Sequence, residues 1–178
     1  MSQLSLRSLL EEYTSAQEFT LTLIDGLDRD QVFWRPNENS SAIAWHLGHQ
    51  GAVNHYMVRN LTAAEVTFNA EFDRVFDSAT PEPNRGDLPQ LDDILGYRNA
   101  IAQSTTSVID RIDASHVAAP AQLRVIAEGL MLAVINHEYQ HSQWISEVRS
   151  ELSDLPIPAP ASQRLTRIDG YWMMVRRI

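Results

Sequence analysis

The chain has 178 residues and a formal net charge of −9, and it contains neither cysteine nor lysine. These two absences exclude disulfides, thiolate metal ligands, a cysteine nucleophile and a lysine Schiff base. The acidic balance argues against nucleic acid as a partner, because contact with phosphates needs a basic surface. The length and the 44% of hydrophobic residues predict one domain, residues 1–178, that buries a sizeable core.

Targeting and membrane segments are not expected. The first residues, Met-Ser-Gln-Leu, lack the basic region and apolar run of a signal peptide. No apolar stretch reaches the roughly 18 to 20 residues that a membrane span needs. Together with the lack of cysteine, this leads us to expect a cytoplasmic protein with no membrane partner.

Four segments have apolar side chains at the spacing of an amphipathic helix. They cover about residues 4–26, 42–60, 91–112 and 121–152. The first is followed by a short helical turn, which ends at Pro36 because proline cannot continue a helix. Ser40 or Ser41 is the expected N-cap of the second helix.

A long connection, residues 61–90, separates the second helix from the third. Its aromatic residues Phe68, Phe72 and Phe76 predict that it packs onto the helices, with a short helix around 69–77. Connections of this length within a domain are usually functional or partly structured. After the fourth helix, residues 170–178 are equally compatible with a strand, a final helical turn or an interface segment.

These elements predict an all-α fold, a four-helix bundle over about residues 4–152 with an extension at 153–178. The connection 61–90 is long enough to carry the chain back along the bundle. The second and third helices would then run parallel, and the fourth would run antiparallel to the second.

Three histidines suggest a metal site. His137 and His141 lie one turn apart on the fourth helix, so both imidazoles can bind one ion from the same side. His49 lies ~12 Å from the start of the second helix, and His141 lies ~17 Å from the end of the fourth, so antiparallel packing brings them to similar heights. A lone buried histidine is more often a core residue, but three buried rings need partners that a shared cation would supply. Three nitrogen ligands leave coordination positions open, as in catalytic sites.

The remaining three histidines are not among the expected metal ligands. His46 lies at the edge of the apolar stripe and is expected beside the ligands, whereas His55 and His116 are expected at the surface or in loops.

Glu138 creates an alternative, because residues 137–141 match the HExxH pattern in which glutamate is the general base of a metalloprotease. Helices precede the motif here instead of a sheet, and no clear downstream ligand follows it. We therefore expect Glu138 to be a solvated carboxylate or a neighbour of the ligands, and it remains a weak catalytic candidate.

Three sequence segments resemble the DinB/YfiT-like superfamily of metal-dependent enzymes. They are Trp-Arg-Pro at 34–36, Ser-Ala-Ile-Ala-Trp-His-Leu-Gly-His at 41–49 and His-Glu-Tyr-Gln-His at 137–141, and the resemblance covers roughly residues 4–152. They are also similar to the iron-binding domain of ergothioneine-type sulfoxide synthases. The resemblance implies an up-down-down-up bundle, metal ligation by His49, His137 and His141, and a homodimer.

The resemblance also implies zinc, nickel or iron as the metal and a low-molecular-weight thiol as substrate or cosubstrate. The first hypothesis is therefore a metal-dependent thiol S-transferase or hydrolase, with its open side lined by the 61–90 connection and by Tyr56, Phe68 or Trp144. The second is a non-catalytic metal-binding stress-response protein. The HExxH metalloprotease is the third.

Overall fold

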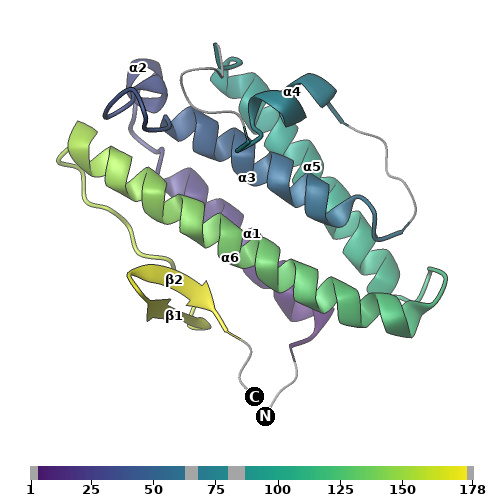
Figure 1. Cartoon of the computed structure of the whole chain (residues 1–178). Coiled ribbons are helices and arrows are strands. Elements are labelled where there is room, and N and C mark those ends of the chain that lie inside the picture. The colour runs from purple at the N-terminus through teal and green to yellow at the C-terminus, as the bar shows by residue number, and fades with distance from the viewer. Residues whose placement is uncertain (1–3, 63–67, 80–86, 176–178) are drawn as a thin grey trace.

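The computed structural model describes residues 4–62, 68–79 and 87–175, and helices make up most of this part (Figure 1). The four long helices are α1 (Leu6–Thr22), α3 (Ile43–Val58), α5 (Leu91–Asp113) and α6 (Pro120–Leu152). Two short helices are α2 (Arg29–Phe33) and α4 (Ala70–Val75), and an antiparallel pair of strands is formed by β1 (Leu165–Ile168) and β2 (Tyr171–Met174). The predicted helical class is confirmed, and α4 falls within the expected 69–77 segment.

The long helices pack along their lengths, α1 against α6, α3 against α5, and α3 against α6 (Figure 1). In the first pair, Tyr139 of α6 donates to Glu12, and Arg149 of α6 donates to the Leu23 carbonyl at the end of α1. Residues later in α1 therefore contact residues later in α6. Helices α1 and α6 therefore run in the same direction. In the third pair, Gln50 donates to the Glu138 carbonyl and His46 contacts His141, so α3 and α6 run in opposite directions.

Local signals explain where several helices begin. The Ser5 hydroxyl accepts a hydrogen bond from the Ser8 amide at the start of α1, and Asp28 forms a capping box with Gln31 at the start of α2. The predicted serine cap of α3 is wrong, because its N-cap is Ala42, which makes no side-chain hydrogen bond. Burial on nearly every side of α3 stabilises this helix instead, as tertiary packing usually does.

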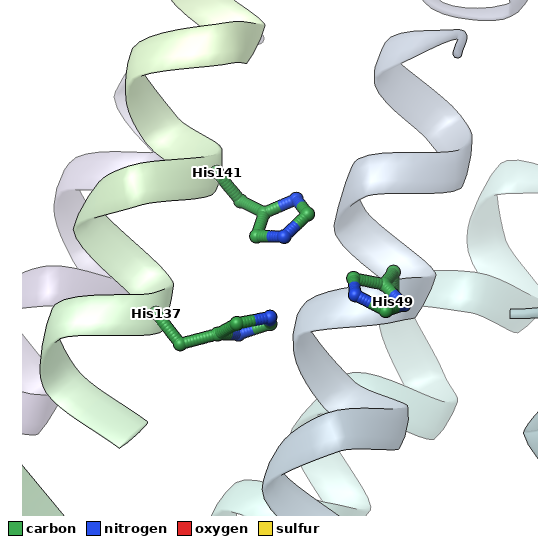
Figure 2. Close-up of side chains that lie close together, drawn as sticks. All are labelled: His49, His137 and His141. Carbon is green, nitrogen blue, oxygen red and sulfur yellow. The ribbon is translucent and has the colours of Figure 1, made fainter. Parts of the chain in front are cut away.

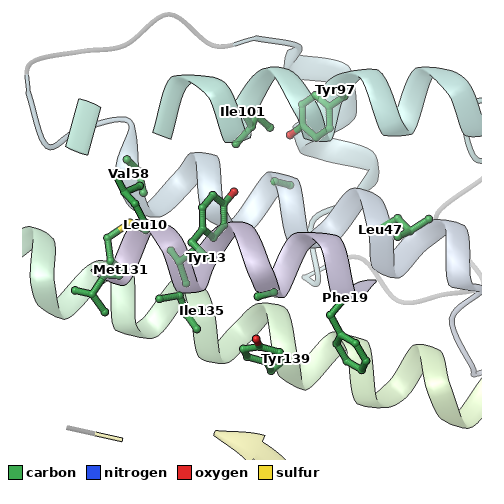
Figure 3. Packing of buried hydrophobic residues seen from close by; sticks show 14 of the residues in the cluster. Leu10, Tyr13, Phe19, Leu47, Val58, Tyr97, Ile101, Met131, Ile135 and Tyr139 are labelled. Atoms are coloured by element: carbon green, nitrogen blue, oxygen red, sulfur yellow. The ribbon is translucent and has the colours of Figure 1, made fainter. Parts of the chain in front are cut away.

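Helix α3 lies between α5 and α6, which is why buried residues occur all round it and not on a single stripe. Leu47 and Val58 belong to this core, and Tyr13, Phe19 and Tyr139 fill the space between α1 and its neighbours (Figure 3).

The C-terminal extension contains a β-hairpin that packs on α6. Asp169 and Gly170 both have positive φ, which suits the two-residue turn that joins β1 to β2. The Asn136 side chain of α6 makes two hydrogen bonds with the backbone of Met174. Of the three alternatives for 170–178, the strand is correct for Tyr171–Met174, and residues 176–178 lie outside the described part.

No described helix is both long enough and apolar enough to span a membrane.

Candidate metal centre

Three histidine side chains converge in the seam between α3 and α6. His49 comes from α3, and His137 and His141 come from α6, with their rings turned toward one another (Figure 2). One ligand nitrogen from each ring lies within 4.8 Å of the others. Three imidazole ligands around a zinc-sized ion would stand about 3.3 Å apart at a metal–nitrogen distance of roughly 2 Å. Small side-chain rotations therefore suffice for all three to reach one ion, and the donor set fits a divalent transition metal.

His49 is held by two neighbours. Its Nδ1 lies 2.6 Å from the carbonyl oxygen of Phe76, to which it donates, and its ring stacks on Trp45 at 4.5 Å between centroids. This hydrogen bond fixes the tautomer, which makes Nε2 the nitrogen that can bind a metal.

His141 is held in a similar way by a side chain. Its Nδ1 lies 2.9 Å from Nδ1 of the buried His46, and its ring meets Trp144 edge-on at 4.6 Å. His46 therefore lies beside a candidate ligand, where the sequence analysis placed it.

Two of the three rings, those of His137 and His141, favour the neutral form that can bind a metal. Burial, with a smaller effect of His49, lowers the pKa of His137 from 6.5 to about 4. Burial and the neighbouring imidazoles of His137, His46 and His49 also lower the pKa of His141 well below its usual value. At neutral pH both rings carry lone pairs, as metal ligands must.

Glu138 is not solvated, contrary to one of its two expected roles. It is 1% exposed, forms an ion pair with the buried Arg98, and accepts a hydrogen bond of 3.0 Å from Thr20. Burial lowers the pKa of Arg98 to about 10, which still leaves it charged at neutral pH. The carboxylate thus faces α1 and α5, and this position argues against a role as general base at the three histidines.

The expectation for His55 is also wrong. It is buried, lies with Nδ1 3.4 Å from Asp73 of α4, and meets Phe68 edge-on. The tertiary fold covers this face of α3 with the connection, which periodicity within α3 does not reveal. His116 is exposed, as expected.

A cavity of about 620 Å³ opens beside His49. Its walls are formed by residues between 49 and 59, from α3 and its C-cap, on one side and by residues between 73 and 78 of the connection on the other. The connection was predicted to line the open side of the site, and its residues between 73 and 78 do line this cavity. Tyr56 is also a wall residue, as expected. Phe68 packs on His55 and Trp144 on His141 instead.

Two contacts around the site were not predicted from the sequence, that of the Phe76 carbonyl with His49 and that of Arg98 with Glu138. A backbone carbonyl carries no sequence signal, so the Phe76 contact could not be found from residue types. Arg98 was a detectable anomaly, a charged residue within the third apolar helix that requires a buried partner.

The fold and site together define a helical protein with three histidines converging between two antiparallel helices. The sequence profile of the DinB superfamily matches residues 12–145, which include all three histidines. The chain belongs to the DinB superfamily. The β-hairpin lies beyond the matched region. The comparison with curated proteins found no match.

Proposed function

We propose that this chain is a metal-dependent enzyme whose single divalent transition-metal ion, zinc, nickel or iron, is held by His49, His137 and His141. The helices around this centre would form the four-helix, up-down-down-up bundle expected for the superfamily. The observation that carries the proposal is the convergence of three largely buried imidazoles, two of them oriented by hydrogen bonds, with the ring of His49 also lining a cavity.

The proposed reaction is thiol S-transfer or hydrolysis. A metal with three protein ligands lowers the pKa of a thiol or water bound at an open position. The chain itself contributes oriented ligands and a partly enclosed space. Phe76 and His46 keep two of the rings in place, and residues of the connection form one wall of the cavity. Because the chain lacks cysteine, any thiol must come from the substrate.

Metal content tests the proposal. We expect protein purified without a histidine tag, or loaded with zinc, nickel or iron and dialysed, to hold about one equivalent by elemental analysis. His49→Ala and His141→Ala should lower this to about a tenth or less, whereas the exposed His116→Ala should not change it. Less than a tenth of an equivalent in the loaded parent protein would disprove the metal centre.

A non-catalytic metal-binding role, for example in a stress response, is the second candidate. It is favoured by the position of the ligands, which would let an ion cross-link α3 and α6 through the core. In that case zinc should raise the melting temperature of the parent strongly, and His141→Ala should remove most of that rise. An enzyme with a pre-packed site should show only a small rise, together with metal-dependent transfer or hydrolysis in a screen of thiol cosubstrates.

The other expectations remain proposals. The family resemblance supports a homodimer that acts on a small molecule, and we further propose that the protein works in the cytoplasm. Sedimentation equilibrium of the metal-loaded protein tests the dimer, and a mass of 20.1 kDa at all concentrations would contradict it.

A further inference from the structure

The cavity that reaches the candidate metal centre at His49 is longer than a single coordinated group requires. It extends along α3 from His49 to Arg59, ten residues later, and residues of α4 and its C-terminal end close the opposite side. Its volume of about 620 Å³ lies within the range of small-molecule sites.

The two aspartates of this cavity already accept hydrogen bonds from other residues of the chain. Asp73 accepts a hydrogen bond of 2.5 Å from the Tyr97 hydroxyl and lies 3.4 Å from His55, and Asp77 accepts one of 3.0 Å from the Ala79 amide. The chain's own donors therefore already occupy an oxygen of each carboxylate.

The two arginines of the cavity are differently placed. The guanidinium of Arg59 lies over the ring of Tyr56 at 5.4 Å, and neither Arg59 nor Arg74 forms an ion pair with any residue in 4–62, 68–79 or 87–175. A guanidinium that lies over an aromatic ring still has N–H groups free to face a ligand. It can then bind a carboxylate or another oxyanion through two parallel hydrogen bonds.

The spacing along α3 indicates the length of the ligand. Ten residues of helix separate His49 from Arg59 by ~15 Å between backbone positions. Helical side chains lean toward the N-terminus, so the Arg59 side chain points back toward His49, as its contact with Tyr56 shows. The guanidinium is thereby brought to roughly 10 Å from the ligand nitrogens.

We propose that the cavity takes an elongated small molecule that has a metal-binding group at one end and an anionic group about 10 Å away, bound by Arg59 and Arg74. This rests on the proposed metal centre and adds the charge and length of the substrate. The exposed ring of Tyr56 supports the middle of the molecule.

Two matched probes test the proposal in cobalt-loaded protein. Mercaptooctanoate carries a thiol and a carboxylate separated by about the required length, and mercaptooctanol replaces the carboxylate with a hydroxyl. Thiolate binding to cobalt gives a charge-transfer band that can be titrated without any knowledge of the reaction. We expect mercaptooctanoate to bind about tenfold more tightly than mercaptooctanol, as the loss of one charge-assisted contact implies. Mercaptopropionate, whose carboxylate cannot reach the arginines, should show no such advantage over mercaptopropanol.

Variants test whether the preference for mercaptooctanoate comes from the two arginines or from the overall charge of the protein. Arg59→Gln and Arg74→Gln should each reduce the preference for mercaptooctanoate, and the double variant should abolish it, while the cobalt content and the affinity for mercaptooctanol stay unchanged. Arg59→Lys should retain part of the preference. Arg7→Gln, which removes a charge from the exposed face of α1, is the control and should have no effect.

The outcomes separate a failure of the anionic substrate from a failure of the metal centre. Cobalt bound through the three histidines, with equal affinity for mercaptooctanoate and mercaptooctanol, overturns the anionic substrate and leaves the metal centre standing. A preference that survives in the double variant also overturns it. Failure of the parent protein to bind cobalt removes the metal centre, and the substrate inference with it.

Discussion

At the scale of single residues, a hydrogen bond between two imidazoles orients one of the three candidate ligands. His46 and His141 share one proton between nitrogens 2.9 Å apart. If Nδ1 of His141 carries this proton, its Nε2 is available to a metal and His46 acts as the acceptor. His46 is thus a positioning residue, and its removal should act through the orientation of His141.

We expect His46→Phe, which keeps a ring in the same space, to lower zinc affinity by about 10- to 100-fold, as changes beside metal ligands typically do. Competition with a chromogenic chelator measures this. The control is His116→Phe, at an exposed histidine. An unchanged affinity in His46→Phe would show that His141 needs no support from His46.

A second residue-scale feature is the ion pair between Glu138 and Arg98, both nearly inaccessible to solvent. Leaving one charge buried without its partner typically costs about 3 to 5 kcal/mol. Glu138→Gln should therefore lower the free energy of unfolding by roughly that amount, measured by urea denaturation of the metal-free protein.

The paired change Glu138→Gln with Arg98→Met tests the cause, because removal of both charges should recover much of the loss. The metalloprotease hypothesis makes the opposite prediction for Glu138→Gln, with peptide hydrolysis lost and stability nearly unchanged. Unaltered stability in this variant would rule out our account of Glu138.

At the scale of elements, the packing of the connection on α3 depends on a glycine. A Cβ atom built at Gly48 would lie 2.2 Å from Cε1 of Phe76, so only glycine lets this ring approach the helix. Phe76 is also the residue whose carbonyl holds His49. One close contact thereby links the end of α4 to the candidate centre.

We expect Gly48→Ala to displace Phe76 and to destabilise the protein by about 1 to 3 kcal/mol, with weaker zinc binding as a second effect. Gly129→Ala in α6 is a matched control, because its Cβ would have no neighbour within 4 Å. That variant should gain up to about 1 kcal/mol from helix propensity. Thermal unfolding of both variants checks the difference, and equal effects would contradict the role of Phe76.

At the scale of the whole molecule, the candidate centre exists because α3 and α6 pack against each other although they are far apart in the chain. Unfolding releases the buried histidines into water, where they bind protons more readily. Because burial lowers the pKa of His137 from 6.5 to about 4, the unfolded state takes up more protons than the folded state between these values.

Metal-free protein should therefore lose stability as the pH falls from about 6.5 toward 4, with His137 and His141 contributing in the same direction. Melting temperatures measured across this range check the prediction. His137→Gln should make the decline shallower, since one of the groups that takes up a proton on unfolding is gone. A decline of identical slope in parent and variant would assign the pH dependence to other groups.

The sequence by itself determined most of the helix positions and the set of three histidines. Apolar periodicity is a local property, so residues 91–112 and 121–152 could be assigned almost to their observed ends. The heights of His49 and His141 followed from helix rise alone. The β1 strand was not predicted, although the Asp169–Gly170 turn was a usable signal.

Only the tertiary structure decided which polar residues face the core. A single stripe describes a helix with one neighbour, but α6 packs on both α1 and α3 and therefore buries two faces. His137 and His141 lie on the face toward α3, whereas Glu138 lies on the other and pairs with Arg98. The orientation of two rings of the candidate centre likewise depends on tertiary contacts, with Phe76 for His49 and with His46 for His141.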